Sequence, residues 1–274
     1  MNLDEIVDCM LLTNQEIQQT QTDHRMKLVD FWEIKSGDRV LEVGCGQGDT
    51  TAVLANAVGS NGFVQGIDIA PRSYGAPFTL GDATDHLKKS PLGNRMDFKL
   101  ATNILQGDIT FSDLEFDVAV LSHASWYFSS KEELTRMLIL LSKWANRVCY
   151  AEWDPQITDV KQSSHQLAVL TQASYEAFKK ETQSNIRTFI SPFDLKEIIA
   201  EHHWKIGEEA SIYSEKMQDS RWEIEYTKNF IAKELEADLG VPDKFKSFLL
   251  SQTKLIHLEN SLPMASYCTS WQVE

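Results

Sequence analysis

Residues 39–50 read RVLEVGCGQGDT, and the fold can be worked out from this stretch outward. The stretch begins with a short apolar run rich in β-branched residues, which predicts a buried strand. Three closely spaced glycines follow and indicate a tight loop. Asp49 and Thr50 come next and can cap a helix, because the residues after them place apolar side chains at helical spacing. A strand, a glycine loop and a helix in this order form the first half of a nucleotide-binding βαβ unit.

The loop glycines are Gly44, Gly46 and Gly48. They allow the backbone to approach a ligand closely, because a Cβ would clash or forbid the positive φ angles that such a turn needs. A turn of this kind can also be purely structural. Glu42 favours a ligand-binding loop over a structural turn. A dinucleotide site would carry an apolar residue at this position, two residues before Gly44, and leave room for a pyrophosphate. A carboxylate repels phosphate and attracts a cation.

The next apolar run covers residues 62–69 (GFVQGIDI) and predicts a second strand. Asp68 lies near its end, about 20 residues beyond the glycine loop, where an acid can accept hydrogen bonds from both hydroxyls of a ribose. Together Glu42 and Asp68 predict a nucleoside ligand that carries a positive group and no phosphate.

Three motifs resemble one superfamily. VLEVGCGQG (residues 40–48) and GIDIA (66–70) resemble motif I and the acidic end of strand two of the class I S-adenosylmethionine-dependent methyltransferases. FDVAVLSHASWYF (116–128) resembles their strand-four region. Within the superfamily the chain is most similar to uncharacterised bacterial small-molecule methyltransferases with an added helical cap, and the resemblance extends over residues 25 to 215.

The resemblance implies an α/β fold. We expect a Rossmann-like, mostly parallel sheet of seven strands with an antiparallel last strand, helices on both faces and an added helical cap. Residues 1–274 would form a single methyltransferase domain with N-terminal helices over the pocket (1–33). A helical lid insertion (155–186), read as a helix of about two dozen residues by its apolar spacing, and a second helical insertion between the last two strands (218–259) would complete it. The last strand is expected at 264–273.

Local signals predict where further helices begin. Thr79 can cap a helix that runs to residue 89, and Ser130 with Glu133 matches a capping box. Ser191 precedes Pro192, a residue that favours the first helical position. The near-continuous apolar run of the fourth strand is typical of a strand buried on both faces.

The composition limits the class of protein. A net charge of −14, from 26 basic and 40 acidic residues, argues against a nucleic-acid partner, since no local basic run offsets the repulsion. The four cysteines lack C-x-x-C spacing, and Asp154, His165, His202 and His203 match no ligand template, so we expect reduced thiols and no metal.

The acidic start, MNLDEIVDCM, differs from a signal peptide, and no apolar run reaches the ~20 residues of a membrane span. We therefore expect a cytoplasmic protein that acts on a small-molecule substrate, with no nucleic-acid or membrane partner; a homodimer stays open.

The resemblance implies S-adenosylmethionine as the cofactor and S-adenosylhomocysteine as its product. In the superfamily an acid or an amide just after the third strand takes the adenine amino group. Asn103 directly follows that strand here, and Asp108 lies in the loop beyond it; we favour Asn103 for its distance from strand four and keep Asp108 as the alternative. The cofactor-binding residues that we expect are Glu42, Gly44, Cys45, Gly46, Gly48, Asp68, Ile69, Ser122, His123 and one of Asn103 and Asp108.

Methyl transfer is an in-line displacement, so the protein supplies mainly positioning and, for a weakly acidic acceptor, a base. His123 is our candidate base, because imidazole titrates near neutrality and the place after strand four faces the transferring methyl in the superfamily. The alternative is that His123 only shapes the pocket. Tyr127 is the second candidate catalytic residue. With Trp126 and Phe128 it can line an acceptor pocket for a flat, apolar or cationic molecule, although all three can also be core residues.

The superfamily places N-terminal helices over the cofactor. Arg25 is then a candidate partner for the cofactor carboxylate, with His24 beside it; the alternative is solvated charge on an amphipathic helix. The polar run at 15–22 predicts an exposed turn or a mobile helix.

Two functions from different classes follow from these patterns. The first is a small-molecule methyltransferase, and the second is a cofactor-binding regulatory or partner module without turnover. An open channel from the aromatic cluster to the sulfonium position would favour the enzyme, and a plugged one the module. A nicotinamide-dependent oxidoreductase is disfavoured by Glu42.

Overall fold

A seven-stranded mixed sheet forms the centre of the protein. The structure, a computed structural model, describes residues 1–179, 182, 184–237 and 240–272. The strand order is β3-β2-β1-β4-β5-β7-β6, with β7 antiparallel to both of its neighbours and the pairs from β3 to β5 parallel. The fold class expected from the sequence is confirmed. The strands are β1 Arg39–Val43, β2 Phe63–Ile67, β3 Met96–Lys99, β4 Phe116–Ser122, β5 Ala145–Trp153, β6 Lys205–Ile212 and β7 Ser266–Gln272.

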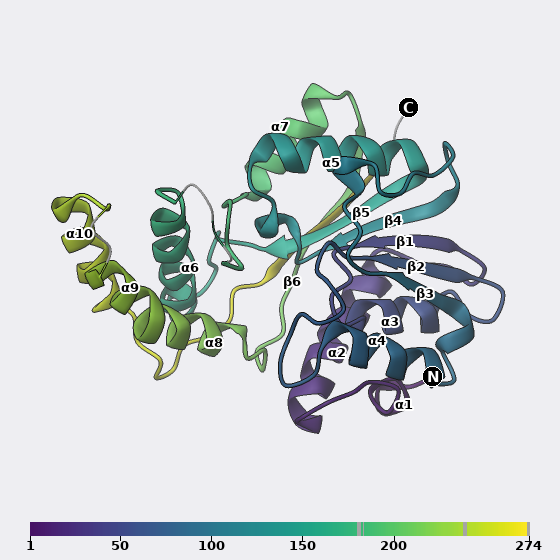
Figure 1. The fold of residues 1–274 in the computed structure, drawn as a ribbon, viewed down its shortest axis with the longest axis horizontal. Coiled ribbons are helices and arrows are strands. Elements are labelled where there is room, and N and C mark those ends of the chain that lie inside the picture. The colour runs from purple at the N-terminus through teal and green to yellow at the C-terminus, as the bar shows by residue number, and fades with distance from the viewer. Residues whose placement is uncertain (180–181, 183, 238–239, 273–274) are drawn as a thin grey trace.

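Helices cover both faces of this sheet. Figure 1 shows α5 (Lys131–Trp144) and α7 (Pro192–Glu201) on one side, with α2 (Gln15–Phe31), α3 (Asp49–Ala57) and α4 (Leu80–Lys89) on the other. Alternate residues of the central strands face two separate cores. On β1, Val40 packs with residues of α2 and α3, whereas Leu41 packs with residues of α5 and α7. This period of two is the one that a strand buried on both faces requires.

The insertions form a cap beside the sheet. It contains α6 (Ser163–Glu176), α8 (Asp219–Tyr226), α9 (Ala232–Ala237) and α10 (Asp243–Thr253), and a π-helical turn at Thr227–Ile231 follows α8. Figure 1 shows these helices grouped at one side of the sheet. They have a core of their own, made by Tyr175, Ile231, Leu235, Val241 and Leu249. Residues 180, 181, 183, 238 and 239 of the expected insertions, and 273 of the expected last strand, lie outside the described residues.

The predicted helix starts at Thr79 and Ser191 are confirmed. Each side chain accepts a hydrogen bond from the backbone of the third helical residue, and that residue's carboxylate bonds back to the cap. Ser130 also caps its helix, but Glu133 bonds back to Ser129 rather than to Ser130, so the capping box is not reciprocal.

Three local expectations were wrong. Residues 15–22 form part of the regular helix α2, as one of the two alternatives held; the turn was wrong, and so was full exposure, since Gln21 and Thr22 are buried. Gly48, with φ 89°, is the N-cap of α3 and makes no side-chain cap, so neither Asp49 nor Thr50 caps that helix. The helix expected to fill two dozen residues of 155–186 is α6, of 14 residues. None of the described helices is both long and apolar enough to span a membrane.

Candidate functional site

The glycine loop after β1 is tied to the end of β2. The backbone N–H groups of Gly44 and Cys45 donate to the carbonyl of Ile67 at 2.9 and 3.2 Å, and that of Gly46 donates to Oδ2 of Asp68 at 2.8 Å. Gly44 has φ 76°, and a Cβ on it would lie 2.6 Å from Cβ of Ala124, so only glycine lets these two turns meet. A Cβ on Gly46 would meet no atom within 4 Å, so this side of the loop faces open space.

Asp68 is fixed at both carboxylate oxygens. Oδ2 accepts from Gly46, and Oδ1 accepts from the backbone of Ala70 at 2.8 Å. A carboxylate has about four lone-pair positions, so each oxygen can accept one further hydrogen bond. The side chain is half-buried, and the next residue, Ile69, is 63% exposed. The structure therefore brings a rigid acceptor and an exposed apolar side chain to the carboxyl edge of β2.

Glu42 lies inside the sheet, opposite Gly66 of β2 and Val120 of β4. It is 3% exposed, and one oxygen accepts from the Thr51 hydroxyl at 2.5 Å. Burial raises the pKa of Glu42 to about 8, against the lowering by the Thr51 hydrogen bond and by Arg25. Among the described residues Glu42 has no ion pair.

Helix α2 lies across the start of α3. Gln18 donates to Asp49 at 3.2 Å, and the guanidinium of Arg25 lies 3.6 Å from the same carboxylate. Arg25 also donates to the backbone and side-chain oxygens of Gln21 at 2.9 Å. Arg25 is thus placed at the glycine loop, while its neighbour His24 is 1% exposed.

The two candidates after β3 belong to one turn. Oδ2 of Asp108 accepts from the backbone N–H of Asn103 at 2.7 Å. Oδ1 of Asn103 accepts from the backbone of Leu105 and Gln106 at 3.0 and 3.3 Å. The side-chain oxygen of Asn103 therefore serves as a local cap, and the choice between the two residues stays a prediction. The Cys45 side chain is buried beside Gly66, which leaves the backbone of Cys45 as its part nearest the loop surface.

His123 directly follows β4 in a left-handed conformation, with φ 50°. For a residue with a Cβ this backbone is uncommon and marks a position held by its surroundings. Its N–H donates to the carbonyl of Ala151 at 2.8 Å, and its ring centroid lies 4.7 Å from that of Trp153. The hydroxyl of Ser122 is buried without a hydrogen-bond partner in the described part of the chain.

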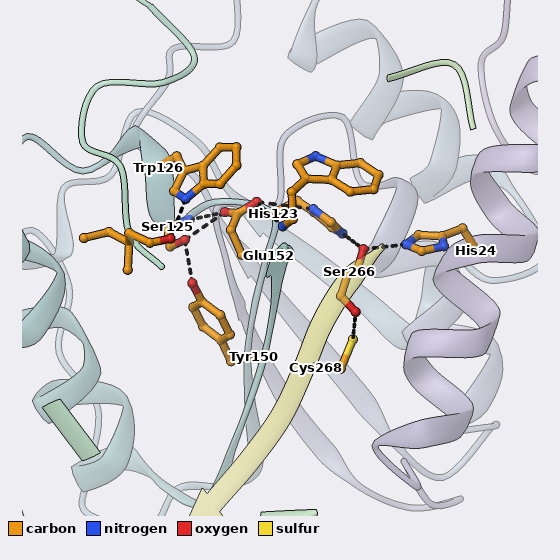
Figure 2. Close-up of polar contacts among 10 residues, drawn as sticks. His24, His123, Ser125, Trp126, Tyr150, Glu152, Ser266 and Cys268 are labelled. Carbon is orange, nitrogen blue, oxygen red and sulfur yellow. Dashed lines mark hydrogen bonds and ion pairs between the residues drawn. The ribbon is translucent and has the colours of Figure 1, made fainter. Parts of the chain in front are cut away.

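Both nitrogens of His123 face polar side chains, as Figure 2 shows. Nε2 lies 3.2 Å from Oγ of Ser266, and Nδ1 lies 3.4 Å from Oε1 of Glu152. Oγ of Ser266 lies 2.9 Å from Nε2 of His24. Sequence reasoning did not assign Glu152 or Ser266 to the site. The strand register offers a signal for Glu152. Ser122 of β4 pairs with Ala151 of β5, so His123, which follows Ser122, lies beside Glu152, which follows Ala151.

The three aromatic residues after His123 have different surroundings. Trp126 is 4% exposed and donates through Nε1 to the carbonyl of Ile190 at 2.9 Å, as a core residue does. Phe128 packs against the same core. Tyr127 is 43% exposed. Partial burial of its hydroxyl, and then the charge of Glu152, raise the Tyr127 pKa, so this side chain stays a proton donor.

The cap adds two acids that sequence reasoning missed. Asp219 and Glu223 lie one turn apart on α8 and accept from Gln21 at 2.9 Å and Gln172 at 2.6 Å. Burial raises the pKa of both carboxyls, and His123 lies near enough to Asp219 to oppose that rise. A helical spacing of four places them on one face, but only the tertiary structure brings Asp219 near His123.

Residues 34–204 match the family model described as a methyltransferase domain, which is more than half of the chain. The chain belongs to this family. The methyltransferase fold here is also that of the class I S-adenosylmethionine-dependent enzymes, as the three motifs predicted.

Individual relatives agree with this assignment. A solved cyclopropane-fatty-acyl-phospholipid synthase-like protein from Lactobacillus casei ATCC 334 is 34% identical, with a TM-score of 0.91 over 99% of this chain and 98% of that one. Magnesium protoporphyrin IX methyltransferase from Synechocystis PCC 6803, solved with S-adenosylhomocysteine bound, shares the fold at 14% identity and a TM-score of 0.52, over 96% of this chain and 90% of that one.

A curated relative, methyltransferase phomM' from Diaporthe leptostromiformis, is 28% identical over an alignment of 158 positions that covers 50% of this chain. The aligned region covers 41% of that relative's length, so this methyltransferase domain spans less than half of it.

Proposed function

We propose that the protein is an S-adenosylmethionine-dependent methyltransferase that acts on a small-molecule acceptor. The observation that carries the proposal is the pair of acids at the glycine loop. Glu42 is a buried carboxyl with no ion pair among the described residues, and Asp68 is an acceptor fixed by the backbone N–H of Gly46 at 2.8 Å. A cationic nucleoside satisfies both: its charge suits Glu42, and its ribose hydroxyls suit Asp68.

The loop amides argue against a phosphate-bearing ligand. A phosphate site needs free backbone N–H groups. Here the N–H groups of Gly44, Cys45 and Gly46 are already used by Ile67 and Asp68, and the nearest side chains are acids. A nicotinamide dinucleotide would therefore not find these three amides free, and the positive charge of Arg25 beside the loop is already paired with Asp49.

When bound, the cofactor would supply an electrophilic methyl group. The protein's part is to hold the acceptor in line with that methyl and to remove its proton. His123 fits the second task through its place after β4 and its partial exposure. Tyr127, which keeps its proton, fits a hydrogen-bond donor to the acceptor better than a base.

Calorimetric titration tests the cofactor. We expect S-adenosylmethionine and S-adenosylhomocysteine to bind and a reduced nicotinamide dinucleotide not to bind. Tighter binding of the dinucleotide would overturn the proposal. Asp113→Asn is a suitable control for changes of acid, because that side chain is 71% exposed and its ion pair, with Lys143 at 3.4 Å, lies outside the candidate site.

A screen with methyl-labelled cofactor tests the acceptor. The panel contains small aromatic and amine metabolites, acyl phospholipids, RNA and protein; phospholipids are included because of the name of the Lactobacillus casei relative. We expect label in a small molecule and none in RNA or protein. Cofactor binding without label in any class would instead support a binding module.

A further inference from the structure

The imidazole of His123 is held by groups from three elements that are far apart in the sequence. His24 comes from α2, Ser266 from β7 and Glu152 from β5. Figure 2 shows them in one row, with Ser266 between the two imidazole rings and Glu152 on the other side of His123. All three are at most 4% exposed, whereas the side chain of His123 that they hold is 24% exposed.

Beyond His24 the row continues through Ser214 to Lys27, and this end can only donate hydrogen bonds. Nζ of Lys27 donates to Oγ of Ser214 at 3.1 Å, and an ammonium has no acceptor. The Ser214 hydroxyl is then free to donate to Nδ1 of His24 at 3.0 Å. Burial, and then repulsion by His123, lower the pKa of His24 to about 2, so this ring is neutral and carries one proton.

With Nδ1 accepting, the proton of His24 sits on Nε2. It is donated to Oγ of Ser266 at 2.9 Å, and the Ser266 hydroxyl in turn donates to Nε2 of His123 at 3.2 Å. The remaining proton of His123 is therefore on Nδ1. Each hydroxyl and each ring in this row donates once and accepts once.

The other end of the row can only accept. Oε2 of Glu152 accepts from the backbone and the hydroxyl of Ser125 at 3.1 and 2.8 Å. The Ser125 hydroxyl lies 2.7 Å from that of Tyr150, whose pKa is raised by burial, so Tyr150 keeps its proton and donates it. Glu152 is thus an acceptor at both oxygens: its Oε1 accepts from the backbone N–H of Trp153 at 3.1 Å and lies 3.4 Å from Nδ1 of His123, which has no other polar partner in the described part of the chain. If the hydrogen bonds of the row ran in the opposite direction, the lone pair of Nδ1 of His123 would face this carboxylate oxygen.

We propose that Ser266, with His24 behind it, and Glu152 are positioning residues that hold His123 in the tautomer with its proton on Nδ1. The proposal rests on the proposed methyl transfer. As the acceptor's heteroatom bonds to the methyl carbon, the carbon–sulfur bond breaks and the acceptor's proton passes to Nε2 of His123. The Ser266 hydroxyl turns away from Nε2, and Glu152 stabilises the imidazolium that results.

The tautomer can be measured without turnover. Long-range ¹H–¹⁵N correlation spectra of the protein labelled with ¹⁵N-histidine distinguish the Nδ1–H and Nε2–H forms, and a His123→Gln spectrum assigns the signal. We expect Nδ1–H in the wild type, and loss of that preference in Glu152→Gln and Ser266→Ala. Ser266→Thr keeps the hydroxyl and should keep the tautomer, as should the control Ser270→Ala on the same strand. An Nε2–H form in the wild type, or no change in either variant, would overturn the proposal.

Kinetics provide the second measurement once an acceptor is known. We expect kcat to fall about 100-fold in Glu152→Gln, the lower range of a general base's contribution, with KM for S-adenosylmethionine unchanged. A kcat that is higher in Ser266→Thr than in Ser266→Ala separates a positioning role from misfolding. Failure of cofactor binding would refute the proposed function while leaving the tautomer result readable, so the two failures are distinct.

Discussion

The backbone N–H of Gly46 donates to Oδ2 of Asp68 at 2.8 Å, so the loop after β1 and the acid after β2 form one unit. This contact fixes the carboxylate before any ligand arrives, and a preorganised acceptor loses little freedom on binding.

We therefore expect Asp68→Ala to weaken S-adenosylmethionine binding about 10- to 100-fold, the range that hydrogen bonds to a charged group provide. The same variant should lose labelled methyl transfer. Calorimetry gives the dissociation constant, with Asp113→Asn as the control. Equal affinity in Asp68→Ala and the wild type would remove Asp68 from the cofactor site.

Gly44 offers a test of close packing between two turns. In Gly44→Ala the new Cβ would lie 2.6 Å from Cβ of Ala124, and the residue would keep φ near 76°. Gly37→Ala is a matched control, since Gly37 also has a positive φ, 98°, but no atom within 4 Å of its Cβ position. We expect both variants to lose about 1–3 kcal/mol of unfolding free energy through backbone strain, and Gly44→Ala to lose more because of the clash. Urea unfolding measures the difference, and equal losses would contradict the close approach.

The sequence was sufficient for the sheet because its strands are locally encoded. The apolar run of β4 and the glycine break after β1 each identify their element without tertiary information. Caps such as Thr79 and Ser191 were found for the same reason. Gly48 was missed as a cap because it makes no side-chain hydrogen bond; its left-handed φ alone ends the loop.

The candidate site was predicted only in part. Residues within the motifs, such as Asp68 and His123, stand out by their place after a strand. Ser266 has no such signal, because it reaches His123 through the antiparallel pairing of β7 with β5, in which it lies opposite Trp153. Asp219 depends on how the cap packs against α2, which no local pattern encodes.

His123 is expected to act on turnover rather than on cofactor binding. Its ring nitrogens face Ser266 and Glu152, and neither partner belongs to the glycine loop. His123→Ala should therefore bind S-adenosylmethionine normally and lower kcat about 100-fold or more for an acceptor that must lose a proton. Full turnover in this variant would remove His123 from the role of base.

Glu42 should make the stability of the protein depend on pH. Burial raises its pKa from 4.5 to about 8, so between these values the folded state holds a proton that the unfolded chain has lost. The free energy of unfolding then falls as pH rises through this interval, and the loss is complete above the higher value. Urea unfolding should show a smaller fall in Glu42→Gln, which cannot ionise. An equal fall in both proteins would show that Glu42 is not the group responsible.

The same proton links Glu42 to its ligand. At neutral pH the buried carboxyl is mostly protonated, and a cation that pairs with it favours the ionised form. Binding of S-adenosylmethionine at neutral pH should therefore release a proton, which calorimetry in buffers of different ionisation enthalpy detects. Glu42→Gln should bind more weakly and release none. Wild-type binding without proton release would place the positive group of the cofactor away from Glu42, and would leave Asp68 as the only acid of the pair that contacts the nucleoside.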